Sequence, residues 1–104
     1  MSDITGDAIK RAVCLEFGVT EDELMSPRRT GRIALARAIA MDLSRRIRKD
    51  RLKVVAWHFG KMDHTTIVAA THKVNGLFST DPEIALRVTA LEARLRAPEL
   101  VEHF

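Results

Sequence analysis

The sequence predicts an all-α protein of five or six helices that includes a helix-turn-helix. Apolar residues recur at spacings of three and four over most of the chain, which is the period of a helix with one buried side. Residues that start helices, such as Thr20, Asp63 and Asp81, stand between these apolar segments. No segment alternates apolar and polar residues over the length of a strand. We therefore expect one helical domain over residues 1–96 and a tail over residues 97–104.

The first predicted helix covers residues 4–17 and ends before Gly18, because glycine often terminates helices. Its apolar side is formed by Ile9, Ala12, Val13 and Phe17. Thr20 and Glu23 are spaced as a capping box and predict a short second helix through about Met25. Pro27 prevents this helix from continuing.

A basic loop is predicted over residues 26–32, where Pro27 and Gly31 bracket residues without apolar periodicity. The longest helix follows over residues 33–49. Its buried stripe consists of Ile33, Ala36, Ala40, Leu43 and Ile47. We expect three arginines to lie together beside this stripe, namely Arg37, Arg45 and Arg48.

Residues 52–78 have the pattern of helix, tight turn and helix. Gly60 is predicted to end the first of these helices, and Asp63 to cap the second. Two helices joined by so short a turn have the spacing of a helix-turn-helix. The second helix should bury Ile67, Ala70, Val74, Leu77 and Phe78. It should expose Thr65, Thr66, Ala69, His72 and Lys73.

The final predicted helix begins with Asp81 as N-cap, Pro82 as its first residue and Glu83 in its first turn. Its buried edge should consist of Ile84, Val88, Leu91 and Leu95, so that the helix closes the core. Pro98 should end it. For the tail beyond this proline three roles stay open: it packs back on the domain, frays, or contacts a partner.

Length and composition exclude several classes of protein. A chain of 104 residues forms one domain without a further catalytic lobe. It has no apolar run of transmembrane length and no signal peptide, so we expect a cytoplasmic, nucleoid-associated protein. The single cysteine, Cys14, is expected to pack as a small residue. The four histidines lack metal-site spacing, and no phosphate-binding glycine loop occurs. We expect neither enzymatic activity nor a metal, cofactor, nucleotide or membrane partner.

Positive charge is concentrated in one quarter of the sequence. Residues 28–53 contain ten Lys or Arg and two acidic residues, a net charge of +8, whereas the rest of the chain has seven basic and twelve acidic residues, a net charge of −5. A basic segment in an otherwise acidic domain favours binding of a polyanion, since each neutralised phosphate releases counterions. A solvated arginine-rich helix is the alternative interpretation.

The exposed side of the second helix of the helix-turn-helix suggests contact with DNA bases. Asp63, His64, Thr65 and Thr66 offer short donors, acceptors and methyl groups, and Ala69 permits close approach. These groups suit the major groove, where base edges present hydrogen-bonding atoms and the thymine methyl. An ordinary helical hairpin with exposed threonine and histidine would show the same pattern.

The segment Phe59-Gly60-Lys61-Met62-Asp63-His64-Thr65-Thr66-Ile67, with Ala70 and Lys73-Val74, resembles the most specific motif of a known family. That family is the C-terminal DNA-binding domain of the bacterial replication initiator DnaA. The resemblance extends back through Ala40-Met41 and Ser26-Pro27-Arg28-Arg29-Thr30 to about Ile4. It implies a Trp repressor-like helical fold and a free-standing domain without the initiator's ATPase domain.

The resemblance also implies roles for individual residues. Arg29 would enter the minor groove, Arg37 would reach base edges and Arg45 would touch phosphate. Double-stranded DNA is the expected partner. The complete predicted DNA-binding set is Arg28, Arg29, Thr30, Arg37, Arg45, Lys53, Asp63, His64, Thr65, Thr66 and Lys73.

Several positions depart from the family pattern, and they leave the preferred DNA sequence open. Ala38 replaces a usual glutamine, Met62 a usual basic residue and Lys53 a usual proline. We expect sequence-selective DNA binding that resembles DnaA-box recognition and regulates replication initiation or transcription. The alternative is a module that binds a replication or regulatory protein without DNA, through the tail or through Val54 and Trp57.

Overall fold

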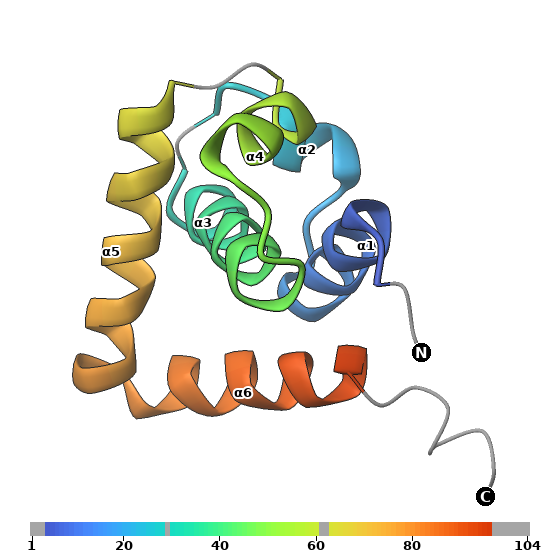
Figure 1. Cartoon of the computed structure of the whole chain (residues 1–104). Coiled ribbons are helices and arrows are strands. Elements are labelled where there is room, and N and C mark those ends of the chain that lie inside the picture. The colour runs from blue at the N-terminus through green and yellow to red at the C-terminus, as the bar shows by residue number, and fades with distance from the viewer. Residues whose placement is uncertain (1–3, 29, 61–62, 97–104) are drawn as a thin grey trace, which may run out of the picture.

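The computed structural model describes residues 4–28, 30–60 and 63–96, and these residues form six α-helices and no β-strand (Figure 1). The predicted all-α fold is confirmed. The helices are α1 (Gly6–Phe17), α2 (Glu21–Met25), α3 (Gly31–Ile47), α4 (Leu52–His58), α5 (His64–Thr80) and α6 (Pro82–Arg96).

Helix α3 lies at the centre of the molecule, and α5 and α6 form two sides of a corner around it (Figure 1). Seven residues of α3 belong to the buried core: Ile33, Ala36, Ala38, Ile39, Ala40, Met41 and Leu43. Helix α5 contributes Ile67 and Val74 to this core. The predicted closing helix, α6, contributes Val88 and Leu91. The arrangement leaves the opposite side of α5 exposed.

The predicted helix starts are formed by side-chain caps. The Thr20 Oγ1 accepts from the Glu23 amide at 3.0 Å, and the Thr20 amide donates to Glu23 Oε1 at 2.9 Å, which confirms the capping box. Asp63 accepts from the Thr65 amide at 3.3 Å. Asp81 accepts from the Ile84 amide at 3.2 Å. Gly60 has a φ of 83° at the end of α4, as its predicted role requires.

The long helix differs from its prediction at both ends. It begins at Gly31 rather than at residue 33, because Thr30 has extended backbone angles and its carbonyl accepts from the Ala34 amide at 2.8 Å. It ends at Ile47 rather than at residue 49, and Lys49 has a left-handed φ of 57°. The basic loop is therefore shorter than expected, and it leads directly into α3.

Within the three stretches that the structure describes, no helix has the length and apolarity needed to cross a membrane. The predicted tail, residues 97–104, lies outside these stretches.

Candidate nucleic-acid interface

A groove of about 760 Å³ lies between α3 and α5. Helix α3 lines it with Ala34, Arg37, Ala38 and Met41. Helix α5 and its cap line it with Asp63, Thr65, Thr66, Ala69, Ala70 and Lys73, and Pro27 of the basic loop completes it. The groove thus brings together five residues of the predicted DNA-binding set, which are Arg37, Asp63, Thr65, Thr66 and Lys73.

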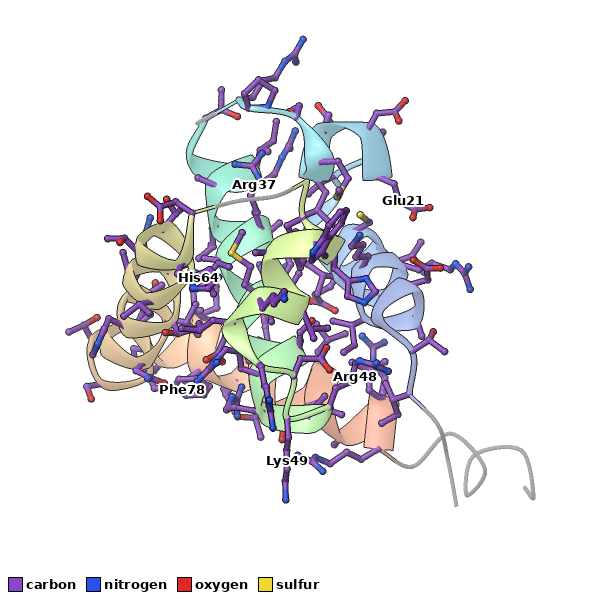
Figure 2. All side chains as sticks on the ribbon, turned by 45° about the horizontal axis from the view of Figure 1, so that its top comes forward. Glu21, Arg37, Arg48, Lys49, His64 and Phe78 are labelled. Carbon is purple, nitrogen blue, oxygen red and sulfur yellow. The ribbon has the colours of Figure 1, made fainter. Side chains whose placement is uncertain are left out.

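The first turn of α5 is presented outward, as predicted. Asp63, His64, Thr65 and Thr66 are all exposed, and Figure 2 shows His64 at this end of the helix. Ile67 and Val74 follow on the opposite side of α5 and are completely buried. This fixed apolar side determines how the helix is rotated and keeps the polar first turn at the surface.

The basic loop lies next to the groove through Pro27. Arg28 and Thr30, the neighbours of Arg29 in this loop, are exposed. Thr30 is also the N-cap of α3, although its side chain makes no capping hydrogen bond. Arg29, the predicted minor-groove residue, lies outside the described residues. Lys61 and Met62 of the helix-turn-helix turn lie outside them as well.

Arg37 does not lie in the surroundings that the sequence led us to expect. We predicted it beside Arg45 and Arg48, but its side chain turns under the loop that leads into α3, and only 8% of it is exposed (Figure 2). Its Nε donates to the Leu24 carbonyl at 2.8 Å and its Nη1 to the Arg28 carbonyl at 3.0 Å. Its Nη2 donates to the carbonyls of Glu23, at 3.2 Å, and Ser26. The predicted contact of Arg37 with base edges stays a prediction.

Arg48 also has local partners rather than an open position beside Arg37. Its Nε pairs with Asp50 at 2.9 Å, and its Nη1 donates to the Ile4 carbonyl at 2.6 Å. Figure 2 shows Arg48 and Lys49 at the end of α3 that is far from Arg37. The expected group of three arginines is therefore not formed.

Three predicted phosphate-binding residues remain exposed cations. Arg45, Lys53 and Lys73 are exposed, and among the described residues no carboxylate forms a salt bridge with them. Arg45 follows Met41 by four residues and Ala38 by seven, so it continues the side of α3 that lines the groove. Lys73 lines the same groove from α5. Positive charge therefore stands on both helices that form the groove.

Four apolar residues of the groove were not in the predicted DNA-binding set. Ala34, Ala38 and Met41 recur on one side of α3, and Ala70 faces them from α5. The predicted buried stripe of α3 did not include its three residues, and only the position of α5 against α3 shows that they line the groove. Ala38 and Met41 are buried core residues, whereas Ala34 and Ala70 are half-buried.

One ionisable group of α1 and one of α2 have shifted pKa values. The pKa of Glu23 is lowered, chiefly because its carboxylate accepts the backbone N–H of Thr20 in the capping box. The pKa of the Cys14 thiol is raised, chiefly by burial, which disfavours a reactive thiolate. Across the described residues, no group of three or more His, Cys, Asp or Glu side chains is placed to hold a metal ion.

Comparison with known proteins supports the resemblance found in the sequence. Residues 6–74 match the family described as the bacterial DnaA protein helix-turn-helix. A protein named chromosomal replication initiator protein DnaA from Rhodopseudomonas palustris (strain BisA53) is 33% identical over 88 residues. A protein of the same name from Chlorobaculum tepidum is 30% identical over 92 residues. These alignments cover 85% and 88% of this chain, which spans about a fifth (19%) of the length of either relative.

Proposed function

We propose that this chain, which belongs to the bacterial DnaA helix-turn-helix family, binds double-stranded DNA sequence-selectively. Its membership in this family supports DNA binding. The binding would use the helix-turn-helix together with the basic loop and would resemble DnaA-box recognition. Its consequence would be regulation of replication initiation or transcription on a bacterial chromosome.

The observation that carries this proposal is the groove between α3 and α5. It combines the polar first turns of α5 with cations from both helices, and the neighbouring loop is basic. In the proposed complex, Asp63, His64, Thr65 and Thr66 meet base edges in the major groove. The loop residues Arg28, Arg29 and Thr30 approach the adjacent minor groove, whose potential attracts guanidinium groups. Arg45, Lys53 and Lys73 hold phosphates.

Base contacts and phosphate contacts make different predictions, and selection from a random duplex library followed by gel-shift titration separates them. Once a preferred duplex is found, Thr65→Ala or His64→Ala should lose roughly 1–3 kcal/mol of binding free energy on that duplex. The same substitutions should change little on an unrelated duplex. The substituted protein should therefore distinguish the two duplexes less well, because contacts to bases account for the difference in affinity between them.

Thr89→Ala is a matched control, since Thr89 is an exposed threonine on α6, away from the groove. It should leave affinity for both duplexes unchanged. A library that yields no enriched duplex would refute sequence selectivity. Equal losses on preferred and unrelated duplexes would refute base contact by the start of α5.

A further inference from the structure

The side chain of Arg37 joins α3 to the end of α2 and to the loop that follows it. Of the six residues 23–28, four have carbonyls that accept from this one guanidinium, namely Glu23, Leu24, Ser26 and Arg28. The Glu23 and Leu24 carbonyls belong to the last turn of α2, where carbonyls have no partner within the helix. Arg37 therefore satisfies the Leu24 carbonyl, and it shares the Glu23 carbonyl with the Ser26 amide and hydroxyl.

The electrostatics of this arrangement bear on an anionic partner. The carboxyl end of a helix carries partial negative charge, and loop carbonyls add to it. These carbonyls lie beside the groove, because Pro27 between them lines it. Without a fixed cation they would repel phosphate groups. Arg37 is buried and always charged, so it neutralises this end of α2 from inside.

The geometry of arginine is specific to this task. A guanidinium is planar and directs five N–H donors in a fixed fork, whereas a lysine ammonium has three donors on a single atom. The Arg37 bonds leave from Nε, Nη1 and Nη2. One ammonium group does not reproduce this pattern, although it preserves the charge. The Arg37→Lys variant therefore keeps the positive charge but loses the hydrogen bonds that order the loop.

We propose that Arg37 is a positioning residue that orders residues 23–28 in the free protein and thereby presents Arg28 beside the groove to DNA. This inference rests on the proposed DNA binding and deepens it. A loop ordered in advance loses less conformational entropy on binding, so its cationic side chain binds more tightly. Arg37 thus raises affinity through the loop.

The first measurement needs no DNA. Hydrogen exchange by NMR should be followed at the amides of Ser26 and Arg28, which donate to the Glu23 carbonyl at 3.1 Å and to Ser26 Oγ at 3.3 Å. Arg37→Lys should speed exchange at both by about tenfold or more, with the buried side of α5 unchanged. Arg45→Lys makes the same substitution at an exposed position on α3 and should leave both amides unchanged. Unchanged loop exchange in Arg37→Lys would overturn the proposal.

The second measurement is a double-mutant cycle on DNA affinity. Arg37→Lys should weaken binding by about tenfold in the unaltered chain. It should weaken binding by less than about twofold in a chain that already carries Arg28→Ala and Arg29→Ala, because the loop then has no cation to present. An equal loss in both backgrounds would mean that Arg37 touches DNA itself, and it would overturn the positioning role.

A further variant keeps the test decisive should Arg37→Lys fail to fold. Pro27→Gly loosens the loop while Arg37 stays in place, since glycine lacks the fixed φ of proline. It should speed loop exchange and weaken DNA binding, again only in the chain with Arg28 and Arg29. Absence of these effects would overturn the proposal. If the unaltered chain binds no duplex, the proposed function fails, whereas retained binding with unchanged loop exchange overturns only the role of Arg37.

Discussion

The basic side chains on the two sides of this molecule differ in what surrounds them. Where α6 packs on α1 and α3, the arginines pair with carboxylates: Arg46 with Asp42 and Glu92, Arg87 and Arg94 with Glu16, and Arg96 with Glu92. Around the groove, Arg28, Arg45 and Lys73 form no salt bridge within the described part of the chain, and neither does Lys53 on α4.

The difference separates two uses of positive charge. A cation that already has a carboxylate partner adds little net charge for a polyanion to neutralise. Its bonds lie within the protein instead, either between helices, as for Arg87 and Glu16, or within one helix, as for Arg96 and Glu92. A cation without such a partner is available to phosphate. The net charge of the sequence therefore understates the basicity of the groove side. We expect substitutions on the α6 side to change stability and substitutions around the groove to change DNA binding.

The largest expected effect on stability is at Arg46. Its Nε donates to Asp42 at 2.8 Å, its Nη1 donates to Glu92 at 2.7 Å, and the Asp42 side chain is only 3% exposed. Arg46→Met would leave this buried carboxylate without its partner. We expect a loss of roughly 2–3 kcal/mol in the free energy of unfolding, below the cost for a fully buried pair, because Arg46 itself is about one third (35%) exposed.

Urea denaturation measures this loss, and gel shifts should find the DNA affinity of the folded variant unchanged. Arg96→Met is the matched control, since Arg96 pairs with Glu92 at 2.9 Å but is half exposed (50%). It should cost less than about 1 kcal/mol. Weakened DNA binding by folded Arg46→Met would contradict the proposed division of the two sides.

The second prediction concerns Asp63, which we expect to contribute both to stability and to DNA binding. Asp63 caps α5 and also lines the groove. Asp63→Ala should lower the free energy of unfolding by about 1 kcal/mol and should also weaken binding to the preferred duplex. Asp81→Ala removes the corresponding cap of α6 and should cost similar stability with no change in DNA affinity. Equal DNA binding by both variants would exclude Asp63 from the interface.

Local sequence signals were sufficient to predict the helix starts but not the surroundings of the arginines. The caps at Thr20, Asp63 and Asp81 depend on residues two or three positions away, so their chemistry is visible in the sequence. The carbonyl partners of Arg37 lie 9 to 14 residues away, and Glu92 lies 46 residues from Arg46. Such contacts depend on how the helices pack. Periodicity alone therefore placed Arg37 on an open basic side.

The third prediction uses salt to compare one cation from each side. Arg45→Ala should weaken binding to preferred and unrelated duplexes alike, by roughly 0.5–1 kcal/mol near physiological salt. It should also reduce the slope of log affinity against log salt by about one, since one phosphate contact is lost. Arg94→Ala is the control, because Arg94 is 64% exposed but pairs with Glu16 at 3.2 Å. An unchanged slope for Arg45→Ala would remove Arg45 from the phosphate contacts.

The smallest effects are expected from two carboxyl groups whose pKa values shift in opposite directions. Burial raises the pKa of Asp42, against the opposing influence of Arg46. The folded state therefore favours the protonated form, and the stability contributed by Asp42 is lost as pH rises through its raised pKa. The Thr20 N–H lowers the pKa of Glu23, so the stability contributed by Glu23 is lost as pH falls through that lowered pKa.

Unfolding free energies measured between about pH 3 and pH 7 test these signs. The stability of the unaltered chain relative to Asp42→Asn should fall with rising pH, and its stability relative to Glu23→Gln should fall with decreasing pH. If the stability of the unaltered chain relative to Asp42→Asn instead falls with decreasing pH, attraction by Arg46 would outweigh the cost of burying the Asp42 carboxylate. The pair of Asp42 with Arg46 within α3 would then stabilise the charged form of Asp42, against the opposing charge of Glu92 on α6.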